Sequence, residues 1–313
     1  MRHVFSEGKW TWFDYDFSSH EQLEELAEEY PTCQRWYDGI KGYHTNNLRM
    51  DTSIIGKEAL WGSLVYRQDI NHKDQKDIFH FYLTKKFLIT YNFKIDVLDE
   101  LDAEAVYKKM HQSDNPIEGF LILIGEIISH FLQKIDDFEM KLRELLWEIK
   151  EENGTDILDK IADSRHELLV WKNLLIPITE IRMGVEEAFG EDTSSKVHFQ
   201  RACKRIERAQ TLISEYGEEL TAMVDLENNV SSHRGNEIMK TLTVLTTLFT
   251  PVTAWGAVWG MNFKHMPELE WEAGYLFSWA AILISTFIIY IYLRKKGWMG
   301  DLLKSKRKNS FFK

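Results

Sequence analysis

Several residue types that point to a specific chemistry are scarce in this chain of 313 residues. It has two cysteines, Cys33 and Cys203, with no Cys-x-x-Cys pair and no histidine pair at ligand spacing beside them. This argues against a disulfide framework and a zinc site, so we expect each thiol to be a small buried hydrophobe. The first twelve residues mix charged and aromatic side chains without an apolar core, so we expect no secretory signal peptide.

The sequence signatures of common enzymes are absent as well. There is no Gly-rich loop followed by Lys and Ser or Thr, no Gly-x-Gly-x-x-Gly and no Gly-x-Ser-x-Gly, and His166-Glu167 lacks the second histidine of a zinc-protease helix. The eleven histidines are scattered along the chain. We therefore predict that the protein is not an enzyme, holds no covalently bound cofactor and is not driven by ATP.

Basic residues are outnumbered, with 38 Lys and Arg against 49 Asp and Glu and a net charge of -11. An acidic chain is a poor partner for nucleic acid, because phosphate binding needs a basic face. Residues 294–313 nevertheless contain eight basic residues and one acid, a net charge of +7. The rest of the chain therefore carries a net charge of about -18. The eight are Arg294, Lys295, Lys296, Lys304, Lys306, Arg307, Lys308 and Lys313.

Strand and helix patterns are mixed only in residues 1–115, which predicts an α/β domain. Two β-branched and aromatic runs flank Thr84-Lys85-Lys86 and predict a hairpin. Ser18 or Ser19 is expected to cap a helix that ends before Pro31. The expected strands cover residues 10–13, 78–83 and 87–93, and the expected helix covers 18–30.

Residues 116–240 predict a helical bundle and a long stalk helix. Apolar residues recur at helical spacing over 120–149, and a second helix over 155–187 is expected to kink or break at Pro177. A third helix starts near residue 193 and carries a coiled-coil-like apolar stripe, interrupted only by Glu227.

Residues 241–263 and 273–293 contain no charged side chain, and a bilayer core needs about 20 apolar residues as helix. We predict two transmembrane helices joined by an extracellular loop, 264–272, and followed by the basic tail, 294–313. The positive-inside rule places that tail, and with it both termini, in the cytoplasm of a multi-pass plasma-membrane protein. A buried helical hairpin would not explain why the basic tail follows the second span directly.

One face of the first span is rich in hydroxyls. Residues three and four apart share a face of a helix. Two interpretations of this hydroxyl-rich face stay open. The threonines either contact the water shell of a hydrated ion, or they bond their own i−4 carbonyls and pack against a neighbouring helix. A pore would need several copies around an axis. The face holds Asn236, Met239, Leu242, Thr246, Thr250, Thr253 and Ala257, and the opposite face holds Leu245, Leu248, Phe249, Val252 and Trp255.

The first span is followed by Gly260-Met261-Asn262 and then by Met266-Pro267-Glu268-Leu269. Together with Asn-Glu-x-Met-Lys-x-Leu-Thr at 236–243 and Phe-x-Pro-x-Thr at 249–253, this segment resembles the CorA family of divalent-cation transporters. The resemblance covers about the last 85 residues by motif and the remainder by architecture. It implies an α+β membrane protein that forms a homopentameric funnel.

The resemblance also implies roles for individual residues. Gly260, Met261 and Asn262 would form the selectivity filter, with Asn262 binding hydrated Mg²⁺ through its water shell. Met239 and Leu242 would form a hydrophobic gate, and Asn236 a polar ring at the cytoplasmic end. Mg²⁺ would be the transported ion and also a candidate regulator.

Some positions depart from the family pattern. Trp259 replaces the usual Tyr, Thr250 replaces a frequent Met, and Lys264 stands where an acid is common. Arg201 and Lys204 align with aspartates that bind regulatory Mg²⁺ in some members, so we assign no regulatory site. Other acids on this part of the chain, which we expect to be a solvated face, are Glu186, Glu187, Glu191 and Asp192.

We predict a Mg²⁺ transporter, with Co²⁺ and Ni²⁺ as further candidate ions and with membrane lipids and copies of itself as partners. Two alternatives stay open. One is a zinc transporter of the ZntB branch, which the lack of thiolate or imidazole ligands in the spans disfavours. The other is a membrane-tethered signalling or scaffold module, which would need neither the threonine face nor Gly-Met-Asn.

Overall fold

The computed structural model describes residues 2–40, 42, 44–95, 103–151, 156–264 and 266–299. The chain divides into two units, residues 1–148 with 154–223 and residues 149–153 with 224–313. The basic residues beyond 300 and the Asn153-Gly154 pair at the end of a predicted helix lie outside the described residues.

The first unit is built on a six-stranded mixed sheet of order β1-β2-β6-β5-β4-β3. β2 and β6 pair in parallel and the other neighbours are antiparallel. The hairpin predicted at Thr84-Lys85-Lys86 is confirmed as the β5–β6 turn, and the strand predicted at 10–13 is confirmed as part of β2. The strands are β1 (Arg2–Phe5), β2 (Trp10–Tyr15), β3 (Asn47–Asp51), β4 (Ala59–Gln68), β5 (Lys76–Thr84) and β6 (Phe87–Tyr91).

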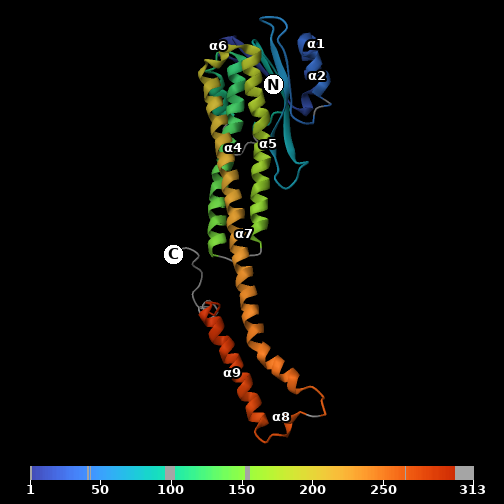
Figure 1. The fold of residues 1–313 in the computed structure, drawn as a ribbon. Coiled ribbons are helices and arrows are strands. Elements are labelled where there is room, and N and C mark those ends of the chain that lie inside the picture. Colours follow the sequence, from blue (N-terminus) through green and yellow to red (C-terminus); the bar gives the residue numbers. More distant parts are fainter. Residues whose placement is uncertain are drawn as a thin grey trace. The chain divides into compact units, whose positions relative to one another are not determined.

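Helices cover both faces of this sheet (Figure 1). Side chains of a strand alternate between faces, so Tyr82 of β5 packs into the cluster formed with α1 and α2, while its neighbour Phe81 meets Phe120 on the other face at 4.8 Å between ring centroids. The helices of this region are α1 (His20–Glu29), α2 (Gln34–Ile40) and α3 (Ala103–Met110), with single 3-10 turns at Ser6–Gly8, Phe17–Ser19 and Pro31–Cys33.

The predicted capping of α1 is wrong in its chemistry. Ser19 is the residue before the helix, but its side chain does not cap it. The hydroxyls of Ser18 and Ser19 instead both donate to Asp16 Oδ1, at 2.6 and 2.8 Å. A cap would accept a neutral hydrogen bond from a backbone N–H of the helix, whereas the bonds to the Asp16 carboxylate are charge-assisted and stronger, so they orient both hydroxyls toward Asp16.

Three long helices form the rest of the first unit. The prediction at Pro177 was a kink or a break, and the break is wrong, since α5 continues through this proline. Pro177 is buried, so packing around it compensates for the hydrogen bond that proline cannot donate. The helices are α4 (Pro116–Glu151), α5 (Ile157–Phe189), the short α6 (Glu191–Ser194) and α7 (Val197–Trp259), which continues into the second unit.

The apolar stripe predicted on the third helix is confirmed by burial. Its members in the first unit lie inside the bundle, and Tyr216 is the half-buried exception. Glu227, the interruption in the stripe, is buried as well. The two thiols differ from the prediction, because Cys33 is buried whereas Cys203 is only half-buried. The buried stripe residues are Phe199, Ala202, Ile206, Ala209, Ile213, Leu220, Met223 and Val230.

The second unit holds the end of α7, the one-turn helix α8 (Pro267–Glu270) and α9 (Gly274–Lys295). Among the described residues, three helices are long and apolar enough to cross a membrane: α4, α7 and α9. The apolar window of α4 is 83% buried inside the protein, whereas those of α7 and α9 are 11% and 6% buried. The windows of α7 and α9 therefore leave apolar side chains uncovered, as lipid-facing helices do.

These elements confirm the predicted fold class. It is an N-terminal α/β domain followed by long helices, two of which are apolar and C-terminal.

Candidate functional site

The hydroxyl-rich face of α7 lies on the open side of the α7–α9 pair. Every residue predicted to line a pore is exposed in the single chain. The opposite face, with Leu245, Leu248 and Phe249, instead lines a groove shared with Leu283 and Phe287 of α9. α9 therefore lies beside the apolar face of α7, where Leu245 and Phe249 stay 52% and 60% exposed, and the polar face lies outside this groove. The exposed face comprises Asn236, Met239, Leu242, Thr246, Thr250, Thr253 and Ala257.

The threonines of this face are bonded to their own helix. Thr246, Thr250 and Thr253 donate to the carbonyls four residues earlier, at 3.0, 2.9 and 3.2 Å. The backbone-bonding reading is thus confirmed, but it does not exclude contact with a hydrated ion. A hydroxyl has one proton and two lone pairs, so each of these side chains has given its proton to the backbone and still presents an acceptor.

Two further acceptors on this part of α7 were missed by the sequence reasoning. Thr243 shares the exposed face, because it lies four residues after Met239 and seven before Thr250. Pro251 lies inside α7 and has no N–H, so the carbonyl of Thr247 loses its helical donor. α7 also bends in this orange part of the ribbon (Figure 1). The i,i+4 spacing from Met239 could have revealed Thr243 in the sequence. Pro251 could likewise have revealed the free carbonyl of Thr247.

Gly260 ends the helix. Its N–H bonds the carbonyl of Gly256 at 2.9 Å, and a Cβ added to Gly260 would lie 2.8 Å from that same oxygen. Only glycine fits here without a shift, because real Cβ atoms do not approach an oxygen this closely. The rings of Trp255 and Trp259 stack at 5.0 Å on the last turn. The predicted span therefore stops at Trp259 as a helix, four residues earlier than expected.

The next residues leave the helix and expose their side chains. Met261 and Asn262 are both exposed, and the Asn262 amide has no hydrogen-bond partner within the part of the chain that the structure describes. Its oxygen and NH₂ group are both free to meet water or a ligand. The loop is less irregular than predicted, since Met266 precedes the short helix α8, which includes Pro267 and Glu268.

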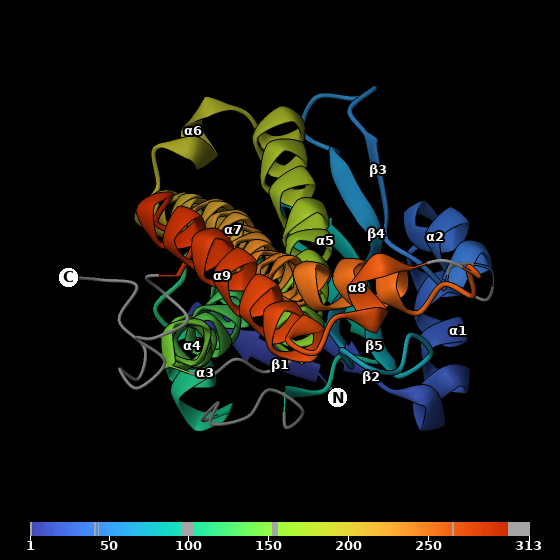
Figure 2. The same ribbon diagram turned by 60° about the horizontal axis from the view of Figure 1, so that its bottom comes forward.

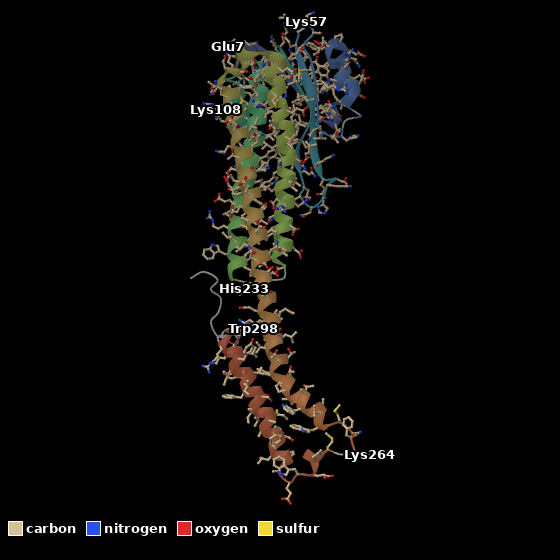
Figure 3. The ribbon with its side chains drawn as sticks, in the orientation of Figure 1. Glu7, Lys57, Lys108, His233, Lys264 and Trp298 are labelled. Carbon is tan, nitrogen blue, oxygen red and sulfur yellow. The ribbon has the colours of Figure 1, made fainter. Side chains whose placement is uncertain are left out.

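Basic residues end α9. Arg294 and Lys295 occupy its last turn, and the ammonium of Lys296 lies 5.9 Å from the Tyr292 ring centroid. In Figure 3, Trp298 and His233 lie at one end of the α7–α9 pair, and Lys264 lies at the other. The basic flank and the Gly-Met-Asn motif are therefore at opposite ends of the two apolar helices.

No regulatory metal site emerges from the described residues, among which no group of three His, Cys, Asp or Glu side chains could hold an ion. Lys204 is paired with Glu207 at 2.7 Å, and Glu186 lies 3.9 Å from Arg182. Arg201 is exposed. Basic side chains thus occupy the two positions where the family resemblance would place carboxylates, and the site stays unassigned.

Comparison with known proteins agrees with these features. The family described as CorA-like Mg²⁺ transporter protein matches residues 7–295. The magnesium transport protein CorA of Bacillus subtilis (strain 168) is 44% identical over 301 residues, which cover 96% of this chain and 94% of that protein. The cobalt/magnesium transport protein CorA of Thermotoga maritima is 23% identical over 235 residues, which cover 73% of this chain and 66% of that protein.

A solved structure is also similar. The complete structure of the CorA magnesium transporter from Methanocaldococcus jannaschii superposes with a TM-score of 0.71 at 20% identity, over 95% of this chain and 93% of that one. At 20% identity the match shows the fold alone. It agrees with the family match, which covers nearly the whole sequence. The predicted resemblance to the CorA family is thus confirmed, and the chain belongs to the CorA-like Mg²⁺ transporter protein family.

Proposed function

We propose that this protein is a magnesium ion transporter that passes hydrated Mg²⁺ down its electrochemical gradient through a pore lined by α7. Co²⁺ and Ni²⁺ are further candidate ions. One α7 cannot enclose a channel, so the pore is formed by several copies, and we propose a homopentamer. The observation that carries this proposal is the free polar face of α7, which ends in an exposed Asn262.

The chemistry of that face suits a hydrated cation. Mg²⁺ dehydrates reluctantly and usually keeps several waters. The first water shell around a cation points its hydrogens outward, and the threonine oxygens accept such hydrogens because their own protons are bonded to the backbone. A ring of Asn262 amides at the entrance, with Gly260 and Met261 shaping the turn, selects the aquo-ion without stripping it.

The cytoplasmic part of the pore is apolar. Met239 and Leu242 are 62% and 53% exposed on the free face of α7, and such a hydrophobic constriction closes a pore by dewetting. Asn236 lies one turn further toward the stalk and forms a polar ring there. Mg²⁺ is the transported ion. A regulatory role for Mg²⁺ would need carboxylates to bind it, and we assign none.

We propose that α7 and α9 span the plasma membrane and that both termini are cytoplasmic. Arg294 and Lys295 at one end fit the positive-inside rule and lie where anionic lipid headgroups are found. The loop with Met266, Pro267 and Glu268 is then extracellular. An inside-negative potential of 100 mV supplies about 2.3 kcal/mol per charge, which is doubled to about 4.6 kcal/mol for a divalent ion, so no chemical energy source is required.

The alternatives have less support. CorA family members are ion transporters, so the prediction that the chain is not an enzyme is confirmed. A tethered signalling module would not need the exposed polar face of α7. A ZntB-like zinc transporter has less support because the relatives from Bacillus subtilis and Thermotoga maritima are named magnesium and cobalt/magnesium transport proteins.

Metal uptake into proteoliposomes tests the proposal. Wild type, Asn262→Ala and the control Asn71→Ala, an exposed asparagine far from α7 in the sequence, are compared with Mg²⁺, Co²⁺, Ni²⁺ and Zn²⁺ outside. We expect Mg²⁺ flux in wild type and in the control, and a loss of about tenfold or more in Asn262→Ala. Unchanged flux in that variant would refute the selectivity role. Absence of flux in wild type would favour the tether, and a preference for Zn²⁺ would favour the zinc transporter.

A further inference from the structure

The α5 helix carries apolar residues all around its circumference, which is typical of a helix covered on every side. One side packs on the sheet, where Leu48 and Leu60 lie against Gly184, and another packs on α4, where the rings of Phe138 and Trp171 are 5.2 Å apart. The third side is open. It holds Leu158, Leu169, Ile176 and Met183, which are 46%, 51%, 56% and 56% exposed.

This open side borders a groove between α5 and α7 with a volume of about 650 Å³. Leu168, Leu169, Leu175, Ile176 and Ile213 form its apolar wall. Gly217 contributes to its width, because a Cβ there would come within 3.6 Å of Leu168.

The charged residues that line this groove are Arg165 and Lys172 on α5 and Glu218 on α7. Arg165 donates to Thr221 on α7 at 2.9 Å, whereas Lys172 has no ion-pair partner in the described part of the chain. The two bases lie on the α5 side of the groove and the one acid on the α7 side. An apolar groove whose α5 edge is basic fits an apolar side chain that is flanked by carboxylates on that edge.

Such a surface exists on α4 of the same chain. Met140 and Trp147 are 59% and 52% exposed and lie seven residues apart, which places them on one face. Asp137 and Glu144 share that face and are exposed, and neither has an ion-pair partner among the residues that the structure describes. The neighbouring positions 139 and 141 point to α7 and α5, through Glu139 to Tyr216 at 3.2 Å and Lys141 to Glu167 at 2.8 Å. The Met140 face therefore points away from the bundle.

The two surfaces also lie at the same level of the bundle. α4 and α5 are antiparallel, and their register follows from the Lys141–Glu167 ion pair and the Phe138–Trp171 contact. By this register Asp137 is level with Lys172, Glu144 with Arg165, and Met140 with Leu168 and Leu169. Figure 2 shows α4 and α5 on different sides of α7.

We infer that the α5–α7 groove of one copy receives the Met140 face of α4 from the next copy. A ring is closed by a heterologous interface, in which two different patches of each subunit meet. Rotation about an axis along the bundle adds no translation, so the two patches must lie at equal heights, as these do. Met140 then enters the groove beside Leu169, with Asp137 against Lys172 and Glu144 against Arg165. This inference rests on the proposed oligomeric transporter.

Disulfide trapping in the full-length protein tests this interface. Met140→Cys is combined with Leu169→Cys in a background without Cys33 and Cys203, and membranes are oxidised before non-reducing electrophoresis. A disulfide needs Cβ atoms about 3.5–4.5 Å apart, so we expect a ladder of linked copies up to the closed ring. The control pair joins Met140→Cys with Met183→Cys, which lies on the same open side of α5 about 21 Å further along, and should give no ladder.

A charge exchange provides a second measurement. We expect Lys172→Glu to lower the oligomer fraction in size-exclusion chromatography by at least severalfold, and Asp137→Lys added to it to restore that fraction. If wild type forms oligomers under an amine-reactive cross-linker but the 140–169 pair gives no ladder, or the control pair gives an equal one, the interface is overturned. A wild type that stays monomeric under the cross-linker would refute the oligomeric pore itself.

Discussion

Asp14 provides a prediction that can be worked through from structure to measurement. It lies in β2, beside Thr90 of β6, whose hydroxyl donates to Asp14 Oδ1 at 2.6 Å. The same hydroxyl oxygen accepts a bond from the Trp12 indole at 2.8 Å. Burial disfavours the charged carboxylate and raises the pKa of Asp14 from 3.8 to about 6, although the bond from Thr90 opposes this effect.

The sign of the effect on stability follows from linkage. The folded state holds the Asp14 proton more tightly than the unfolded state, so the stabilising contribution is complete below pH 3.8 and is lost as the pH rises through 6. A pKa that rises by about 2 corresponds to roughly 3 kcal/mol at 1.36 kcal/mol per unit. Since the side chain is only partly buried, we expect about 1–3 kcal/mol. This is the amount by which ionised Asp14 destabilises the fold at neutral pH.

Asp14→Asn keeps the oxygen that Thr90 bonds and removes the charge. At pH 7.5 we expect the variant to unfold at a temperature about 2–12 °C above wild type, at roughly 2–4 °C per kcal/mol. At pH 4 the two should unfold together. His80, whose pKa burial lowers to about 4, destabilises the fold as the pH falls from 6.5, but it is present in both proteins and cancels in the difference.

Thermal unfolding of the full chain in detergent, followed by tryptophan fluorescence at pH 4, 6 and 7.5, measures the difference. Asp16→Asn is the matched control. The Asp16 pKa is lowered by its hydrogen bonds from Ser18 and Ser19, so this control should lose stability at pH 7.5 rather than gain it. A gain in Asp14→Asn that does not change with pH, or no gain at pH 7.5, would show that the buried charge is not the cause.

Three further changes test the packing and the pore. Gly119→Ala places a Cβ against the ring of Trp10 and should destabilise the fold by about 1–3 kcal/mol, measured by denaturant unfolding. Leu242→Ala should raise resting Mg²⁺ flux severalfold in the proteoliposome assay, because the apolar constriction widens. Thr250→Val should lower flux, whereas Thr241→Val, on the opposite side of α7, should not. Equal flux in the two threonine variants would contradict the role of the pore-face hydroxyls.

Local patterns in the sequence predicted those features of the fold that depend only on helix length, apolarity and helical spacing. The two charge-free stretches predicted α7 and α9 because a membrane span needs only length and apolarity. The stripe that includes Ile206 and Ile213 predicted the buried side of the stalk, since helical spacing fixes which residues share a face. The threonine face was predicted in the same way.

Features that depend on distant residues could not be predicted from local patterns. The parallel pairing of β2 with β6 joins Thr11 to Phe87, and nothing in either strand specifies its neighbour. Pro177 locally predicts a kink or a break, but it is buried in the packed unit and α5 continues through it. The level match between Met140 and Leu169 depends on the side-chain contacts between α4 and α5, which appear only in the folded bundle.

The hydrogen bonds of Thr246, Thr250 and Thr253 to their own helix have a consequence for protons. A proton relay along a wall requires groups that can accept a proton on one side while they donate one on the other. A threonine whose single hydroxyl proton is held by a backbone carbonyl can accept but cannot pass one on. The wall of the proposed pore is therefore broken as a proton wire at each of these residues, so Mg²⁺ can cross along it without the wall itself dissipating the proton gradient of the membrane.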